Sequence, residues 1–418
     1  MVNYHKADRR GNKSIRLRRF NERRVLQALR RMGGASKAEL ARHAGLTNAA
    51  VGDIISSLGD QGLVYLGEKR HAGGRGQPAT IIHLNGTAAY SIGVRLDRSA
   101  IETVLVDFDG KLMSRTFYDM LLPEPKQALE IIKKDIHNIF DFLKKDKQKR
   151  LSGIGLAIPF NLDSWLTELN LPSDHFSSWK DVDFAAEIEK AVNIHVYSEN
   201  DGTAAAIAEL FYGVGREIDN FLHLFIGPGL GGGLVLNGEI VHGDSGNAAD
   251  VGLMPVPPSE LPSAPQPKGA FDIMLNRTSI NTLIRHLQYA GISIETKTDL
   301  ERVIVEEPAP LFEWIDDCTK ALTHLIWSGR LLLDVPTVIL GSDFSGRLTE
   351  ILKSRLEISL ADSAPESRIP PNIVIGSFGI DAGAVGAASL PIFYSFSPSK
   401  DILIKETNSN FMQRSAAK

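Results

Sequence analysis

Residues 36–66 read SKAELARHAGLTNAAVGDIISSLGDQGLVYL, and this stretch decides the fold of the N-terminal part of the chain. Ser36, followed three residues later by Glu39, has the pattern of a capping box, which predicts a helix from Lys37 to Ala44. Gly45 supplies the positive φ that ends such a helix. The stretch is therefore predicted to begin with a short helix and a tight turn.

A second helix is predicted from about Thr47. Its apolar residues recur at the spacing of one buried helical face: Val51, Ile54, Ile55 and Leu58. Its first turn, residues 47–50, is small or polar, as is typical of a helix that reads base edges in the major groove. Val25, Leu29 and Met32 give an apolar stripe to a helix upstream. The three segments together predict a helix-turn-helix.

Two short apolar runs, residues 63–66 and 80–84, read as the strands of a wing. The tip between them, residues 69–78, carries Arg75 and Gln77. Residues 21–86 are therefore predicted to form a winged helix-turn-helix domain. A three-helix module that binds another protein is the alternative interpretation.

The charge distribution favours double-stranded DNA as the partner. Residues 1–84 contain 16 Lys and Arg against 6 Asp and Glu, whereas the rest of the chain contains 30 against 44. A basic head can release counterions from phosphates, while an acidic body is repelled by DNA. Residues 1–20 are expected to form a basic arm without fixed structure.

Within the winged helix, specific residues are expected to contact DNA. Thr47, Asn48 and Ala49 are expected to face bases, and Lys37 to contact phosphates. Arg75, flanked by glycines, is expected to enter the minor groove, and Gln77 belongs to the same DNA-binding tip.

Composition sets the broad class. With 418 residues, 43% of them hydrophobic, the chain is long enough for two or three domains. Its single cysteine, Cys318, excludes an intrachain disulfide and a cysteine-rich zinc site. It has no signal peptide and no run of about 18 apolar residues, so we expect a soluble cytoplasmic protein.

After the wing, two successive units each place a β-hairpin before alternating strands and helices. The first starts with a strand at residues 91–96, and the second with a strand at residues 221–226. We expect two similar lobes, residues 87–200 and 201–392, with a ligand cleft between them. The remaining residues, 393–418, are expected to form a C-terminal tail.

Four motifs of the chain resemble those of one known family. They are the glycine-rich loop IGPGLGGG at 226–233, Glu199-Asn200-Asp201, GAVGAA at 383–388, and Arg75-Gly76-Gln77-Pro78. The chain thus resembles the ROK family of repressors, open reading frames and sugar kinases. The resemblance implies two actin-like (ribonuclease-H-like) α/β lobes behind a winged helix-turn-helix. It also implies either sugar phosphorylation, or binding of sugars and sugar phosphates that controls transcription, commonly in dimers.

The kinases that the chain resembles carry an Asp-x-Gly-Gly-Thr loop after their first strand, for ATP phosphates and magnesium. In this chain Arg95 stands at the acidic position and Asp97 at the first glycine. A carboxylate there repels a triphosphate, and loss of the glycine blocks close backbone approach. The glycine pair on the adenosine side is replaced by Ser342 and Asp343. We therefore expect a kinase-like body without ATP chemistry, and no enzyme activity.

On the sugar side the resemblance implies a set of ligand-binding residues. In the kinases the Asp of the Asn-Asp pair takes the proton from the sugar hydroxyl, which places Asn200 and Asp201 at the ligand, near Gly229 of the glycine-rich loop. Asp250 and Asp272 stand where the family has sugar-facing Glu residues. A shorter carboxylate reaches less far and would admit a different or larger ligand. Solvated loop residues are the alternative interpretation of Asp250 and Asp272.

The zinc site typical of the family is not expected in this chain. It needs a histidine, replaced here by Leu253, and a cysteine run, replaced by the proline-rich segment 255–268. We expect no metal and no other cofactor. The proline-rich segment either takes over the ordering role of the metal or is disordered.

These features together predict a sugar- or sugar-phosphate-responsive transcriptional regulator, a repressor that binds operator DNA as a homodimer or higher homo-oligomer. Two alternatives remain open. One is a sugar kinase fused to a DNA-binding head, and the other is a regulator whose body binds a protein partner.

Overall fold

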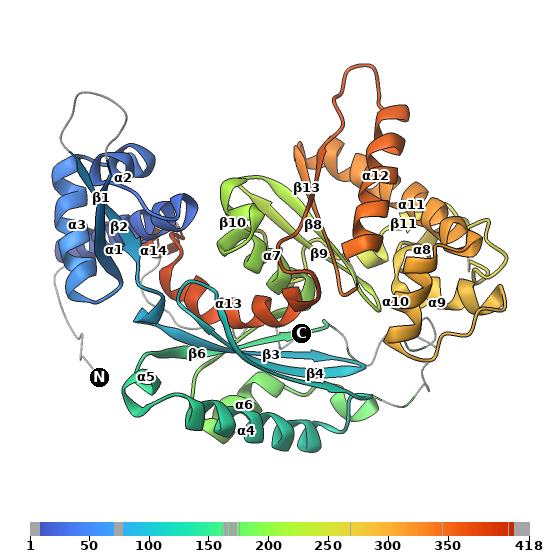
Figure 1. Cartoon of the computed structure of the whole chain (residues 1–418), viewed down its shortest axis with the longest axis horizontal. Helices are drawn as coiled ribbons and strands as arrows, with labels where there is room; N and C mark the ends of the chain where they lie inside the picture. Colours follow the sequence, from blue (N-terminus) through green and yellow to red (C-terminus); the bar gives the residue numbers. More distant parts are fainter. Residues whose placement is uncertain are drawn as a thin grey trace.

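The computed structural model describes residues 9–70, 78–160, 162, 166, 174, 176–267, 269–344, 346–399 and 401–404. Figure 1 shows a small N-terminal domain beside two sheets, each covered by helices. This α/β architecture, a winged helix followed by two lobes of one topology, confirms the fold class predicted from the sequence. Among the described residues, no helix is both long and apolar enough to span a membrane.

The N-terminal domain is a winged helix-turn-helix. Its elements are α1 (Arg9–Met32), α2 (Lys37–Ala44), α3 (Asn48–Asp60), β1 (Val64–Arg70) and β2 (Ala79–Leu84). The capping box is present, because the Ser36 hydroxyl accepts from the Glu39 amide and the Glu39 carboxylate accepts from the Ser36 amide. Gly45 ends α2 with a φ of 60°. Local sequence signals therefore determine this turn.

The structure of the N-terminal arm differs from the one expected from the sequence. We expected residues 1–20 to lack fixed structure, whereas α1 begins at Arg9 and continues without a break to Met32. The helix continues through Gly11 and Asn12, and residues 9–20 contain no proline that would break it. Residues 1–8 lie outside the described residues.

The first lobe is a five-stranded sheet of order β5-β4-β3-β6-β7. Its strands are β3 (Tyr90–Asp97), β4 (Ala100–Asp107), β5 (Leu112–Asp119), β6 (Leu151–Ile158) and β7 (Val196–Asn200). Helices α4 (Pro125–Phe142) and α6 (Phe184–Val192) cover one face of this sheet (Figure 1). The short elements are η1 (Gly86–Ala88), α5 (Lys145–Gln148) and η2 (Ser177–Trp179).

The second lobe repeats this topology in the order β10-β9-β8-β13-β14. Its strands are β8 (Phe221–Ile226), β9 (Leu230–Leu236), β10 (Glu239–Ile240), β13 (Thr337–Ser342) and β14 (Asn372–Ile375). Its helices are α9 (Ile280–Tyr289), α10 (Lys297–Glu306), α11 (Ala309–Leu333) and α12 (Gly346–Asp362). The short elements are η3 (Val214–Glu217), η4 (Val251–Leu253), α8 (Leu275–Thr278) and η5 (Gly379–Asp381). Cys318 is a buried core residue of α11.

Two helices rich in small residues, α7 (Asp201–Phe211) and α13 (Ala382–Phe396), pack against each other between the sheets (Figure 1). A Cβ atom on Gly386 would lie 2.6 Å from the backbone of Ala204, so only glycine permits this approach. Gly93 on β3 and Gly155 on β6 likewise lack the Cβ atom that would clash with the backbone of α13. Helix α13 therefore packs on the first sheet, although the lobe boundaries expected from the sequence placed it in the second lobe.

The proline-rich segment is described up to Pro267. Its strand β11 (Pro255–Val256) pairs with β12 (Asp272–Ile273) in antiparallel register. Ser263 Oγ lies 2.8 Å from Nδ1 of His286, whose Nε2 lies 3.1 Å from the Glu313 carboxylate. A side-chain hydrogen bond thus ties the segment to α9, and His286 in turn contacts α11.

The winged helix is anchored on the body through α1. The Arg30 guanidinium is 5% exposed, donates to Phe108 O at 2.8 Å, and lies over the rings of Phe108 and Phe211. Arg23 donates to the carbonyls of Tyr394 and Ser397, where α13 ends. Helix α14 (Asp401–Ile404) also packs on α1. The hydrophobic core is continuous across this contact, so head and body form one packed unit.

Candidate functional site

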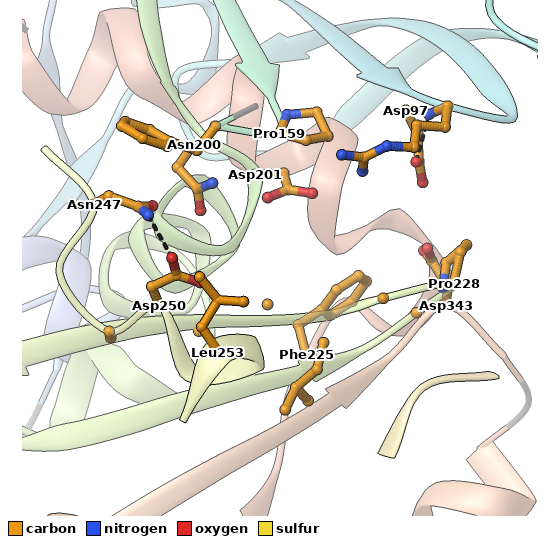
Figure 2. Close-up of a pocket in the computed structure, with 18 of the residues that line it drawn as sticks. Asp97, Pro159, Asn200, Asp201, Phe225, Pro228, Asn247, Asp250, Leu253 and Asp343 are labelled. Atoms are coloured by element: carbon orange, nitrogen blue, oxygen red, sulfur yellow. Dashed lines mark hydrogen bonds between the residues drawn. The ribbon is translucent and has the colours of Figure 1, made fainter. Parts of the chain in front are cut away.

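A pocket lies between the two sheets, at the carboxyl ends of their parallel strands. Its lining comes from the ends of β3, β7, β8 and β13, from the loop after β8 and from the start of η4. Its cavity volume is about 110 Å³, which is smaller than the roughly 300–1,000 Å³ of small-molecule sites, and it opens to solvent. Ligands of α/β sheets bind at such an edge. Figure 2 shows its polar side chains pointing into one space.

Asn200 and Asp201 are positioned by the junction of β7 and α7. Asn200 is the N-cap of α7, and its Oδ1 accepts from the amides of Gly202 and Thr203. Asp201 is the first residue of the helix, and its Oδ1 accepts from Gly202 N at 2.9 Å. Burial, and then the nearby Asp97 carboxylate, raise the pKa of Asp201. The structure thus places both predicted residues in the pocket.

Asp250 faces Asp201 across the pocket from the second lobe (Figure 2). It precedes η4, and its Oδ2 accepts from Asn247 Nδ2 at 2.8 Å. Burial raises the pKa of its carboxyl group. Gly229 also lines the pocket, as expected from its loop. Asn247 was missed in the sequence, since only the fold of its loop brings it to Asp250.

Asp272 does not line the pocket, although we expected it at the ligand. It lies in β12, is 6% exposed, and its carboxylate accepts from Ile273 N and Asn276 Nδ2. The pairing of β12 with β11 holds its backbone at the start of α8, away from the pocket. The carboxylate therefore organises this turn.

An ion pair between Arg95 and Asp343 joins the two lobes at the pocket. The guanidinium of Arg95, on β3, contacts both carboxylate oxygens of Asp343, which follows β13, at 3.1 and 2.6 Å. It also donates to Asp97 at 3.2 Å. Burial alone would lower the pKa of Arg95, but the carboxylates of Asp343 and Asp97 raise it. Lys297, on α10, donates a hydrogen bond from Nζ to the backbone carbonyl oxygen of Asp343.

This bridge unites two positions at which the sequence departs from the kinase pattern. The sequence singled out both Arg95 and Asp343, yet gave no sign that they pair. A second ion pair lies beside them, where Arg115 contacts Glu102 at 2.6 Å and Asp381 at 2.8 Å. The buried Arg95–Asp343 bridge therefore joins the two lobes, while Arg115 links β4 and β5 to the start of α13.

The residues present do not fit a zinc ion. Leu253 offers no ligand atom, and Cys318 is buried inside α11. Across the part of the chain that the structure describes, no three His, Cys, Asp or Glu side chains gather in a group that could hold a metal.

The candidate nucleic-acid interface is the outer side of α2 and α3, which Figure 1 places away from both sheets. The side chains of Lys37, Thr47, Asn48 and Ala49 are exposed there. The Thr47 hydroxyl also caps α3 by accepting from Ala50 N at 3.2 Å. Arg75 and Gln77 lie outside the described residues. Exposed Arg42 borders the same surface and was not singled out in the sequence.

Comparison with known proteins covers most of the chain. The family model described as "ROK family" matches residues 91–392. An uncharacterized protein, y4fQ from Sinorhizobium fredii, is 27% identical over 383 residues, covering 90% of this chain and 92% of that protein.

Relatives with named functions fall into two groups. The xylose repressor of Bacillus subtilis is 25% identical over 241 residues, covering 57% of this chain and 61% of the repressor. A glucokinase of Thermotoga maritima is 25% identical over 311 residues, covering 72% of this chain and 96% of the enzyme.

Among solved structures, a ROK family transcriptional regulator homologous to the Mlc protein of E. coli has the same fold. Its TM-score is 0.65 at 20% identity, covering 93% of this chain and 100% of that chain. The likeness therefore includes the N-terminal domain as well as both lobes.

Proposed function

Because the chain belongs to the ROK family, we propose that it is a transcriptional repressor that binds operator DNA as a homodimer and responds to a sugar held between its lobes. The observation that carries this proposal is the Arg95–Asp343 ion pair in the cleft of a body that follows a winged helix. Relatives named as xylose repressors support the same class of function.

The ion pair favours a regulator over a sugar kinase. Phosphoryl transfer needs a triphosphate and its metal ion positioned between the lobes. Here Asp97 and Asp343 carry negative charge into that cleft, and Arg95 is already engaged by both. A fused kinase is the second candidate, favoured by the relative named as a glucokinase. Sugar-stimulated ATP hydrolysis by the purified protein would support that candidate and contradict ours.

Two helices connect the pocket with the winged helix. Helix α7 begins with Asp201 at the pocket and ends with Phe211, which lies under the Arg30 guanidinium. At the start of α13, Gly383 lies against the Arg95 side chain. At the end of α13, backbone carbonyl groups accept hydrogen bonds from Arg23. A sugar that favours one arrangement of the lobes would thus shift the anchored heads of a dimer, and with them the operator affinity. This response requires no metal.

DNA binding is tested first through Asn48 and Lys37. We expect Asn48→Ala to weaken operator binding by about 1–3 kcal/mol, because it removes a base contact. Lys37→Ala should weaken binding to all sequences and lower the salt slope by about one, since it removes a phosphate contact. The measurement is fluorescence anisotropy at several salt concentrations, with DNA selected from a randomised duplex pool.

Lys145→Ala, an exposed cation of the first lobe, is the matched control and should bind DNA like the wild type. Wild-type affinity and wild-type salt dependence in both test variants would exclude this face of α2 and α3 as the DNA interface.

Sugar binding is tested through Asp201. We expect Asp201→Ala to weaken sugar binding at least about tenfold, because a hydrogen bond to a carboxylate contributes about 1.5–3 kcal/mol. Calorimetry with a panel of five- and six-carbon sugars measures this. Asp272→Asn should bind like the wild type, because Asp272 lies outside the pocket. A sugar that binds wild type and Asp201→Ala equally would place the site elsewhere.

A further inference from the structure

We propose that the pocket selects an unphosphorylated sugar and rejects the phosphate ester of the same sugar. This inference rests on the proposed function and specifies the chemical class of its effector. It follows from which polar atoms of the pocket are still available to a ligand, and from the sign of the charge around them.

The available atoms are acceptors. Oδ1 of Asp201 is bonded to Gly202 N, and no partner is found for Oδ2 within the described part of the chain. In Asp250, Oδ2 accepts a hydrogen bond from Asn247 Nδ2, and no partner is found for Oδ1 within the described part of the chain. Ionised carboxylates only accept hydrogen bonds, and sugar hydroxyls donate them. Asp201 and Asp250 can thus hold a polyhydroxylated ligand from opposite sides of the pocket.

The donors that could receive a phosphate are already used. The Arg95 guanidinium is held by Asp343 and Asp97. A helix N-terminus is often an anion site, but at α7 the side chains of Asn200 and Asp201 occupy the amides of Gly202 and Thr203.

Two further donors of the lining, the Gly227 amide and Arg98, are also engaged within the protein. In the glycine-rich loop, Gly227 N donates to Gly229 O at 2.9 Å. Arg98, the second cation of the lining, donates from Nε to Leu162 O, and its amide donates to Asp97. A phosphate that bound at either of these donors would have to displace its internal partner.

The charge of the pocket lining also disfavours a phosphate group. Four carboxylates line the pocket, Asp97, Asp201, Asp250 and Asp343, against two guanidinium groups, Arg95 and Arg98. The Asp97 carboxylate lies close enough to Asp201 to raise its pKa, although burial is the larger cause of the shift. A phosphate ester brings about −1.5 to −2 further charges at neutral pH. Its repulsion is strong in a partly buried site.

The experiment is calorimetry on the full chain with matched pairs. Glucose, xylose and N-acetylglucosamine are each compared with their terminal phosphate esters, with inorganic phosphate as a further probe. We expect at least one free sugar to bind about tenfold or more tightly than its ester, and inorganic phosphate not to bind. An ester that binds as tightly as its free sugar, or more tightly, overturns this inference and leaves the proposed function standing. If no free sugar and no ester binds, both are overturned.

Asp97→Asn tests the role of charge separately. Asparagine can still accept from Arg95 and from Arg98 N but carries no charge, so the ratio of sugar to ester affinity should fall severalfold toward one. Asp244→Asn, an exposed carboxylate outside the pocket, should keep the wild-type ratio. An unchanged ratio in Asp97→Asn would overturn pocket charge as the source of the selectivity.

Discussion

Replacing Arg95 with Ala is expected to lower the free energy of unfolding by about 3–5 kcal/mol, because it leaves buried carboxylates without their counter-charge. The side chains of Arg95 and Asp343 are only 8% and 10% exposed, and Asp97 shares the same guanidinium. Urea denaturation of the full chain measures the change. Arg302→Ala is the matched control, since that arginine is 55% exposed and should contribute no more than about 1 kcal/mol.

The double variant separates the ion pair from the individual residues. Asp343→Ala alone is also expected to destabilise, because it removes the bidentate partner of Arg95. Together, Arg95→Ala and Asp343→Ala should cost less than the sum of the single changes, since each single change already removes the pair. Strict additivity would show that the bridge contributes no coupling between the lobes.

Arg30→Ala is expected to destabilise the protein by about 2–5 kcal/mol and to loosen the winged helix from the body. The substitution removes a packed side chain, a hydrogen bond to Phe108 O, and stacking on Phe108, Phe211 and Tyr212. Unfolding should change from one transition to two, and a protease should cut earlier near the junction of head and body. Urea denaturation and timed proteolysis measure these effects.

Two further variants sharpen the Arg30 experiment. Arg30→Lys keeps the charge but loses the planar group, so most of the destabilisation should remain. Arg18→Ala, on the same helix but with a side chain that is 65% exposed, should behave like the wild type. Equal stability and equal cleavage rates for Arg30→Ala and wild type would contradict the anchoring role of Arg30.

Features with local causes could be predicted from the sequence. The capping box at Ser36 and the glycine after α2 depend on a few adjacent residues, and both occur as expected. Asn200 caps α7 through a local pattern, whereas the expectation that Asn200 and Asp201 meet a ligand came from the resemblance to the ROK family. The alternation of strands and helices likewise revealed two lobes of one topology.

Features with distant causes could not be predicted. Arg95 and Asp343 are 248 residues apart, and neither neighbourhood indicates the other. Asp272 was misplaced because its position depends on pairing with a proline-rich strand. The packing of α13 on the first sheet depends on Gly93 and Gly155, because a side chain at either position would clash with the helix. The need for glycine there cannot be recognised until the position of the helix is known.

The position of α13 also bears on how the protein is made. Residues 90–200 leave the ribosome well before α13, yet one face of their sheet is covered by this helix, which ends at Phe396. Until translation has nearly finished, the face of β3, β4 and β6 that α13 covers stays open, and a neighbouring nascent chain or a chaperone can reach Val104 and Val106 of β4 on it. A chain that stops before Ala382 therefore lacks part of its first lobe, and we expect such fragments to aggregate during synthesis.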